Sequence, residues 1–290
     1  MKKIKIIWRL VDGKAGHDKQ SLALVENLKS QARCKIFNIN IQNLANPFIA
    51  IIFKKYNLDK GLIKPDIAIG AGHKTHLYLL AIKRCFSTKV VVILKPSLPL
   101  KFFDLCVIPK HDDVKNKNKN NIITTQTALV SFNSNLKKKE NVVLFLIGGP
   151  SKHYYWNTKL VLDQIKYISK QCEFKRLILT TSRRTPLGFI NEFNKLKIKD
   201  VKLYEHMKIK NDWLEKKIIK AKNIWVTNDS YSMIIEAIAS GAHTNILNLK
   251  VKKNSKLSKE INIIKNNLRK KLPIQNEAKR VSEFIQKIWF

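Results

Sequence analysis

One stretch decides the fold: Asn223-Ile224-Trp225-Val226-Thr227-Asn228-Asp229-Ser230-Tyr231-Ser232-Met233-Ile234-Ile235-Glu236-Ala237-Ile238-Ala239-Ser240-Gly241. Its first four residues have strand composition, and the polar residues after them begin a helix with capping candidates Asp229, Ser230 and Ser232. Gly241 stands where a C′ glycine ends a helix. A strand, a polar turn and a helix can bind a nucleotide, because N–H groups and the positive end of the dipole attract a diphosphate. An ordinary capped helix with an apolar core face is the alternative.

Both halves of the chain alternate strand-like and helix-like segments. In the first half we expect strands at Ile4–Leu10, Cys34–Asn40, Pro65–Gly70, Lys89–Leu94, Asp104–Pro109 and Ile122–Thr125, with helices at Gln20–Gln31, Pro47–Tyr56 and up to Phe86. In the second half we expect strands at Asn141–Ile147, Lys175–Leu179, Val201–Glu205 and His243–Leu249, with helices at Trp156–Gln171, after Pro186, at Asp212–Lys220 and at Glu277–Trp289. This alternation predicts an α/β protein with two doubly wound parallel sheets.

The pattern lapses between Ser131 and Glu140, so we place the domain boundary there. We expect a Rossmann-like domain over 1–135 and a second domain over 141–275. The helix within 276–290, after a break at Pro273, is expected to pack back on the first domain. Ligands of such sheets bind beyond the carboxyl ends of the strands, which predicts a site in a cleft that the two domains face.

The charge is the unusual part of the composition. The chain has 290 residues and a formal net charge of +35, with 48 Lys and 8 Arg. A charge of this size suits nucleic acid, an anionic membrane or acidic substrates. A chain rich in Lys, Asn and Ile also matches an AT-biased coding sequence. We expect no nucleic-acid partner, because few arginines are present and no basic run is interleaved with aromatics. Attraction to anionic lipid stays open.

Four scattered cysteines, Cys34, Cys85, Cys106 and Cys172, form no Cys-x-x-Cys pair and indicate buried thiols in a reducing compartment. The N-terminal apolar stretch is interrupted by Lys5, Arg9 and Asp12, which disfavours a signal peptide. No segment is long and apolar enough to span a bilayer. We therefore expect a cytoplasmic protein, with association at the inner face of a membrane as an open alternative.

Two loops of the first half carry candidate ligand-binding residues. Asp12-Gly13-Lys14-Ala15-Gly16-His17 crowds charged groups into a turn that geometry alone would fill with Gly and Asn. Gly70 and Gly72 allow close approach of a ligand, and His73 follows them. His73 and His76 have a spacing that could bind metal, but no third ligand is near in sequence, so acceptor binding or helix capping is favoured.

Three loops of the second half are expected to meet on one ligand. Gly148-Gly149-Pro150-Ser151-Lys152-His153 offers free backbone donors and a lysine, which suit a phosphate. Ser182 precedes Arg183 and Arg184, and an arginine pair in a lysine-rich chain indicates anion binding. The third loop carries Asp229, Ser230 and Ser232. Glu236, about two turns into its helix, can accept hydrogen bonds from a ribose.

Taken together, these stretches resemble a known family. The stretches Asp12–His17, Gly70–Gly72, Ile147–His153, Thr180–Pro186 and Thr227–Glu236 look like those of bacterial members of the mitochondrial-fission (elongated-mitochondria) family, which is similar to GT-B glycosyltransferases. The resemblance covers nearly the whole chain. A looser likeness exists to the transferase that adds N-acetylglucosamine to a lipid-linked peptidoglycan precursor, where His17, Glu236 and Gly241 match and Lys14 and Ala15 depart from its glycine loop.

The resemblance implies a metal-independent glycosyltransferase of GT-B type that uses a nucleotide-diphosphate sugar as substrate and no cofactor. The implied catalytic residues are His17 or Asp12 as general base, and the implied acceptor-side residues are Lys14, Gly16, Gly72 and His73. The implied donor residues are Gly148, Gly149, Ser151, Lys152, Ser182, Arg183, Arg184, Asp229, Ser230, Ser232 and Glu236. A lipid-linked or envelope glycan acceptor is the implied partner. A GT-B-shaped scaffold without activity and a nucleotide-sugar epimerase are the alternatives.

Overall fold

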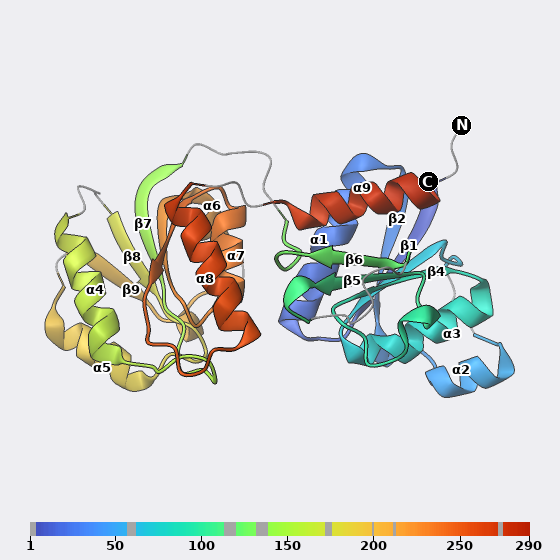
Figure 1. Ribbon diagram of the computed structural model, residues 1–290, viewed down its shortest axis with the longest axis horizontal. Helices are drawn as coiled ribbons and strands as arrows, with labels where there is room; N and C mark the ends of the chain where they lie inside the picture. The colour runs from blue at the N-terminus through green and yellow to red at the C-terminus, as the bar shows by residue number, and fades with distance from the viewer. Residues whose placement is uncertain are drawn as a thin grey trace. The chain divides into compact units, whose positions relative to one another are not determined.

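The computed structural model describes residues 4–56, 62–112, 120–131, 139–171, 176–198, 200–210, 213–271 and 275–290. Cys172, Pro273 and most of the expected boundary at Ser131–Glu140 lie outside these residues. The chain divides into two compact units, one made of Met1–Ser131 with Gln275–Phe290 and the other of Phe132–Ile274. Each unit contains one sheet whose strands are all parallel (Figure 1).

The first unit has a sheet with the strand order β2-β1-β3-β4-β5-β6. Its strands are β1 (Lys5–Val11), β2 (Cys34–Asn40), β3 (Ile67–Ala71), β4 (Lys89–Ile93), β5 (Leu105–Pro109) and β6 (Ile122–Thr125). The chain passes from β1 to β2 on one side and then returns to β3 on the other. The turns after β1 and β3 therefore flank the point where the strand order reverses, which is where ligands of such sheets bind.

Helices cover both faces of this first sheet. On one face, α1 (Ala15–Gln31) and α9 (Glu277–Trp289) pack over Ile7, and on the other α3 (His76–Phe86) packs over Trp8. Neighbouring residues of a strand point to opposite faces, so an all-apolar strand can serve two cores. The short helix α2 (Pro47–Phe53) lies against α3.

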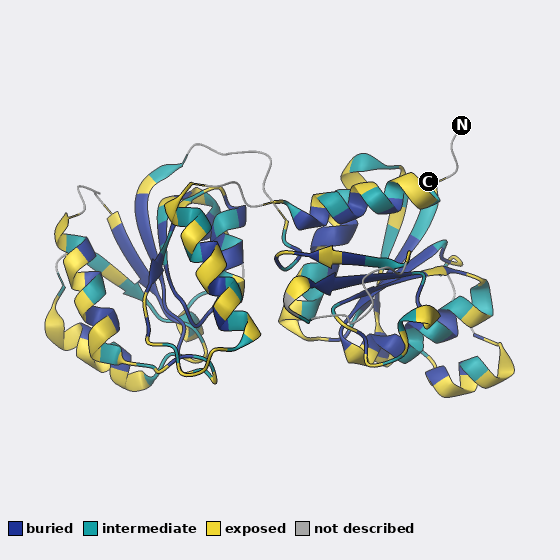
Figure 2. Cartoon of the chain, in the orientation of Figure 1, coloured by how far each residue is buried: buried dark blue, intermediate teal, exposed yellow. Residues whose placement is uncertain are grey.

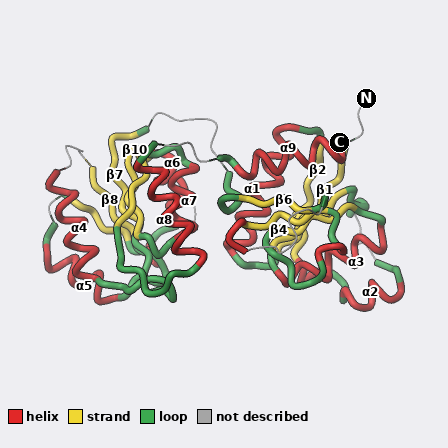
Figure 3. The backbone as a smooth tube through the Cα atoms, viewed as in Figure 1, coloured by secondary structure: helices red, strands yellow, loops and turns green. Residues whose placement is uncertain are grey.

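The second unit has a sheet with the strand order β11-β10-β7-β8-β9. Its strands are β7 (Glu140–Leu146), β8 (Arg176–Thr180), β9 (Val201–Tyr204), β10 (Ala221–Thr227) and β11 (His243–Leu247). Its helices are α4 (Thr158–Gln171), α5 (Leu187–Leu196), α6 (Trp213–Lys220), α7 (Tyr231–Ala239) and α8 (Lys256–Arg269), and Figure 3 shows helices on both sides of the strands. Here the strand order reverses between β7 and β10.

The predicted α/β class with two parallel sheets is confirmed. Gly241 has φ +72° just after α7, as a C′ glycine should. One expected boundary was wrong, and one helix was missed. Helix α1 begins at Ala15, five residues before the expected start, so Gly16 and His17 lie in its first turn. Helix α8 was not anticipated, although Ser255 and Ser258 form a capping box at its start.

Candidate functional site

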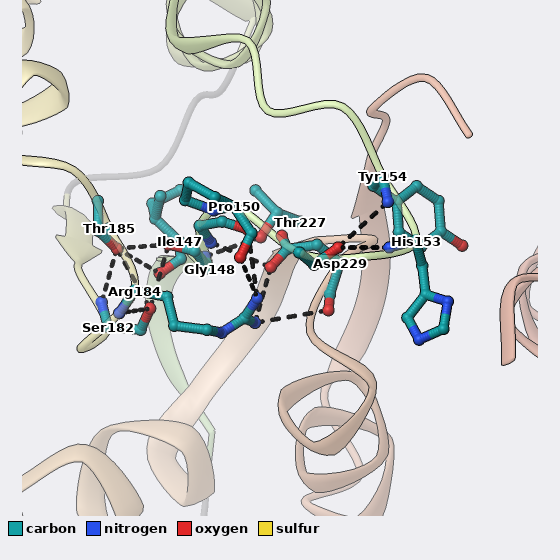
Figure 4. A network of polar contacts seen from close by, with 12 residues as sticks. Ile147, Gly148, Pro150, His153, Tyr154, Ser182, Arg184, Thr185, Thr227 and Asp229 are labelled. Atoms are coloured by element: carbon teal, nitrogen blue, oxygen red, sulfur yellow. Dashed lines mark hydrogen bonds and ion pairs between the residues drawn. The ribbon is translucent and has the colours of Figure 1, made fainter. Parts of the chain in front are cut away.

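The turn after β7 is held by side chains from the turn after β10. The N–H of Gly148 donates to Oγ1 of Thr227 at 2.8 Å (Figure 4). The N–H of Gly149 donates to Oδ2 of Asp229 at 3.0 Å. A Cβ on Gly148 would lie 2.3 Å from Asp229 Oδ2, and one on Gly149 would lie 1.9 Å from the carbonyl oxygen of Arg184. Only glycine fits at these two positions, because neighbouring chain segments approach the backbone so closely.

The turn after β8 is bound to the same glycines. The hydroxyl of Ser182 donates to the Gly148 carbonyl at 3.1 Å, and the Thr185 hydroxyl lies 2.5 Å from that oxygen. The N–H of Ser182 donates to Oγ1 of Thr185 at 2.9 Å. The turns after β7, β8 and β10 therefore meet at the carboxyl edge of the second sheet, beside its reversal point.

An ion pair joins two of these turns. Nη2 of Arg184 lies 2.7 Å from Oδ2 of Asp229, whose side chain is fully buried, while the arginine side chain is partly exposed. Nη1 of Arg184 also donates to the carbonyls of Gly149 at 3.2 Å and Pro150 at 3.1 Å. The other carboxylate oxygen of Asp229 is buried without a hydrogen-bond partner among the described residues. The pair fixes the guanidinium in one place by charge-assisted bonds.

These contacts correct two predictions for the second unit. The N–H groups of Gly148 and Gly149 were expected to be free for a phosphate, but Thr227 and Asp229 already accept them. Asp229, Ser230 and Ser232 were the capping candidates for α7, yet its N-cap residue is Ser230, which makes no side-chain cap bond. Oδ2 of Asp229 is instead bound by the Gly149 N–H and by the Arg184 guanidinium.

Ser151 closes the glycine turn upon itself. Its hydroxyl oxygen accepts the N–H groups of His153 at 3.3 Å and Tyr154 at 3.1 Å. Burial, reinforced by the negative charge of Asp229, raises the pKa of Tyr154 to about 12. Burial, followed by the charge of Lys152, lowers the pKa of His153. Sequence analysis did not include Tyr154, Thr185 and Thr227 among the site residues. Of these three, only the position of Thr227 at the end of an apolar strand could have indicated that it lies at the site.

The remaining predicted donor residues lie on the same loops but differ in exposure. Lys152, Arg183 and Ser232 are exposed, Glu236 is half-buried on the second turn of α7, and Ser230 is buried. No hydrogen bond or ion pair to Arg183 is found within the described part of the chain. The two adjacent arginines therefore differ: Arg184 is bound by the turns, while Arg183 is exposed.

A histidine and an aspartate pair in the first unit. Nδ1 of His17 lies 2.9 Å from Oδ2 of Asp12, and Oδ1 of Asp12 accepts the N–H of Lys14 at 3.0 Å. Burial of Asp12 raises its pKa, but the hydrogen bonds from His17 and Lys14 outweigh burial, so the pKa of Asp12 is lowered overall. A neutral His17 that donates from Nδ1 to Asp12 keeps Nε2 as its basic nitrogen.

Gly72 packs against the imidazole of His17. Its φ is +79°, and a Cβ there would lie 2.1 Å from Cε1 of His17. The turns after β1 and β3 therefore meet at the reversal point of the first sheet. Lys14, the N-cap residue of α1, and Gly16 in its first turn are both exposed.

The two neighbouring histidines have different surroundings. His73 is exposed in the 3₁₀ turn His73–Thr75, whereas His76 is buried with Nδ1 3.2 Å from the Ser97 hydroxyl. Burial, followed by the charge of His73, lowers the pKa of His76 to about 4. Across the described ranges, no three or more His, Cys, Asp or Glu residues gather in a way that could hold a metal ion. Nor does any helix there have the length and apolar character to cross a membrane.

Solved structures share this fold at low identity. A putative UDP-N-acetylglucosamine 2-epimerase from Listeria monocytogenes is 10% identical with a TM-score of 0.55, over 98% of this chain and 95% of that one. Another UDP-N-acetylglucosamine 2-epimerase is 15% identical with a TM-score of 0.55, over 99% and 96%. The E. coli heptosyltransferase WaaC with ADP is 10% identical with a TM-score of 0.52, over 91% and 99%. The chain therefore has the fold of GT-B glycosyltransferases and nucleotide-sugar epimerases.

Sequence comparison identifies the family. The uncharacterized protein RP120 of Rickettsia prowazekii (strain Madrid E) is 29% identical over 113 residues, which are 37% of this chain and 32% of that protein. The match thus spans about a third of that curated relative's length. A much longer match, over residues 15–278, is to the family described as Mitochondrial fission ELM1, and the chain belongs to that family.

Proposed function

We propose that this protein is a glycosyltransferase that moves a sugar from a nucleotide-diphosphate donor to a hydroxyl of an envelope or lipid-linked acceptor, without a metal ion. One observation carries the proposal. Three polar turns, after β7, β8 and β10, are bound to one another at the reversal point of the second sheet, and two of them carry the exposed cations Lys152 and Arg183. Ligands of parallel sheets bind at such points.

The second unit would hold the donor. Glu236 on α7 would accept hydrogen bonds from the ribose, and Ser232 with the first N–H groups of α7 would bind the diphosphate. Arg183 and Lys152, both exposed on the converging turns, would stabilise the charge that develops on the leaving nucleotide. In this assignment Gly148, Gly149, Ser151 and Ser182 shape the turns, and Asp229 holds Arg184.

The first unit would hold the acceptor. His17 Nε2 would take the proton from the acceptor hydroxyl while the hydroxyl oxygen forms a bond to the anomeric carbon of the sugar. The bond between that carbon and the diphosphate breaks at the same time, and the nucleoside diphosphate leaves with the bonding electrons. Asp12 would orient His17 and stabilise the imidazolium that forms, since its carboxylate is buried and contacts Nδ1. Lys14, Gly16, Gly72 and His73 would line the acceptor side.

The test is nucleotide binding. Isothermal calorimetry with UDP, ADP, GDP and dTDP should show binding of at least one of them by the wild type. Glu236→Ala should weaken that binding by about 10-fold or more, because each lost 1.4 kcal/mol is a factor of ten. Glu192→Ala removes an exposed carboxylate from α5 and is the matched control, which should bind as the wild type does. Equal affinities of the Glu236 variant and the wild type would remove the ribose assignment.

Two alternatives predict different results. A scaffold that recruits membrane or envelope partners through a GT-B shape would be stabilised by no nucleoside diphosphate in a thermal-shift screen, whereas a donor-binding enzyme is stabilised by its ligand. The solved epimerases have the same fold, and an epimerase would bind the nucleotide but convert the sugar without any acceptor. Mass and NMR analysis of the nucleotide sugar after incubation distinguishes conversion from transfer.

A further inference from the structure

Helix α2 of the first unit has no polar side chain. Its seven residues are Pro47-Phe48-Ile49-Ala50-Ile51-Ile52-Phe53. Pro47 and Ala50 are buried toward the rest of the unit, but four large apolar side chains are not: the exposed fractions are 59% for Phe48, 56% for Ile49, 69% for Ile52 and 71% for Phe53. Figure 2 shows exposed residues along this helix at the edge of the unit.

The four exposed side chains form one continuous face. Successive residues of a helix are rotated by about 100°, so positions 48, 49, 52 and 53 fall within an arc of roughly 140°. A helix on the surface of a globular protein normally turns polar side chains outward. Contiguous exposed apolar residues instead mark a surface that contacts another molecule or a membrane.

Helix α2 is fastened to the body of the unit. Ala50 packs in a small core with Tyr56 and Ala81, and the Cys85 thiol donates to the Ala50 carbonyl at 3.4 Å. The Tyr56 hydroxyl donates to the Ala45 carbonyl at 3.4 Å. These contacts fix the buried side of α2 to the unit, so its apolar face points outward. A molecule bound to this face would therefore be attached to the whole first unit.

The surroundings of the apolar face are basic. Lys54 and Lys55 follow Phe53 directly and are exposed. No acidic residue occurs in the described segment 44–56, which contains α2. Aromatic and aliphatic side chains beside lysines suit the boundary between lipid tails and anionic headgroups. The net charge of +35 adds a longer-range attraction to the same surface.

We propose that α2 docks the protein on an anionic lipid membrane, with the side chains of Phe48, Ile49, Ile52 and Phe53 in the interface and Lys54 and Lys55 against the headgroups. A second copy of this chain fits the face less well, because two chains that each carry a net charge of +35 repel one another. The inference deepens the membrane-linked acceptor in the proposed function, but it requires no sugar transfer to be correct.

The experiment is co-sedimentation of the full chain with vesicles of phosphatidylcholine alone and of phosphatidylcholine mixed with phosphatidylglycerol. The wild type should bind the mixed vesicles. The double variant Phe48→Ser with Phe53→Ser should bind them at least about 10-fold more weakly, since two buried aromatic side chains are lost. The double variant Lys54→Gln with Lys55→Gln should lose roughly 10-fold of the preference for the mixed vesicles.

The matched control is the double variant Tyr167→Ser with Ile263→Ser. It removes two apolar side chains of similar exposure from α4 and α8 of the second unit, and it should bind vesicles as the wild type does. Wild-type affinity in the Phe48 and Phe53 variant would overturn the inference, because charge alone would then explain binding. The inference would also be overturned if the wild type does not bind vesicles and instead forms dimers in light scattering, and if the Phe48 and Phe53 variant does not form these dimers.

The two proposals fail separately. Calorimetric nucleotide affinity in the variant of Phe48 and Phe53 should equal that of the wild type, because α2 carries none of the donor residues. If the protein binds anionic vesicles through α2 but binds no nucleoside diphosphate, the proposed docking surface is supported and the proposed transferase function is contradicted.

Discussion

Asp229 and Arg184 form an ion pair of 2.7 Å across two turns, and the carboxylate oxygen of that pair also accepts the N–H of Gly149. The second unit therefore supplies its own anion to the glycine turn and to the arginine (Figure 4). A phosphate that approaches these turns would meet a carboxylate that already binds the Arg184 guanidinium and the Gly149 N–H. The pair therefore limits how Arg184 and the Gly149 N–H can contribute to binding an external anion.

Asp229→Asn should lower stability and raise anion affinity. The amide oxygen can still accept the Gly149 N–H, but the charged bond to Arg184 is lost, which should cost about 1–3 kcal/mol of unfolding free energy in urea titrations. Arg184 would then lack its internal carboxylate, so calorimetric affinity for pyrophosphate should increase. Glu140→Gln, which removes the charge of a half-buried partner of Arg176 and Lys220, should change stability by less than about 1 kcal/mol. Equal stability of Asp229→Asn and wild type would contradict the structural role.

Arg183→Ala and Arg184→Ala should have opposite profiles. Loss of Arg184 removes bonds to Asp229, Gly149 and Pro150, so the melting temperature should fall. Loss of the exposed Arg183 should change stability by no more than about 0.5 kcal/mol. Nucleoside diphosphate affinity should instead fall by about 10-fold in Arg183→Ala, because a charge-assisted contact is lost. Unfolding and calorimetry on both variants, side by side, separate the two roles, and an unchanged affinity in Arg183→Ala rules out that assignment.

Gly72→Ala should displace His17. The added Cβ would lie 2.1 Å from the His17 ring, at a φ of +79° that disfavours alanine, so stability should fall by about 2 kcal/mol or more. The ring resonances of His17 in NMR spectra should shift at the same time. Gly16→Ala is the control, because its Cβ would meet nothing within 4 Å in a helix and should stabilise the protein by about 0.5–1 kcal/mol. Unmoved His17 resonances in Gly72→Ala would show that this close contact does not position the ring.

The buried His76 should make the protein less stable in mild acid. Its pKa of about 4 lies below the ordinary value of 6.5, so the unfolded chain binds more protons than the folded chain between these values. Stability from this group is therefore complete above about pH 6.5 and is lost progressively as the pH falls toward 4. Thermal melts across that range should show a smaller dependence on pH in His76→Gln than in the wild type. An identical dependence in both proteins would assign the acid sensitivity to other groups.

The architecture could be predicted from the sequence because parallel strands buried on both faces are nearly continuous apolar runs, as in Val142–Ile147. The meeting of three turns followed from one rule, since the carboxyl ends of parallel strands share an edge. The use of the Gly148 and Gly149 N–H groups could not be predicted. It depends on where the Thr227 and Asp229 side chains turn, and a residue pattern does not specify that choice.

Boundaries and exposure were the other limits of sequence analysis. Helix α8 lies in a lysine-rich segment whose apolar positions, Ile261 and Ile264 among them, were obscured by charge. Helix α2 was anticipated, but periodicity alone does not say that Phe53 would be exposed and Ala50 buried, because every residue of the helix is apolar. Which arginine would be held and which left open was likewise settled only by the contacts of Arg184.

Helix α9 belongs to the first unit but is synthesised after the second unit. Its residues Ala278, Val281 and Ile285 complete the core over α1, and Gln286 donates to the carbonyl of Gln31, yet they leave the ribosome after the whole second unit. The second unit can therefore mature on the ribosome while the first still exposes an uncovered apolar layer. Chains interrupted before residue 275 would keep that layer bare, which makes them substrates for chaperones and proteolytic quality control.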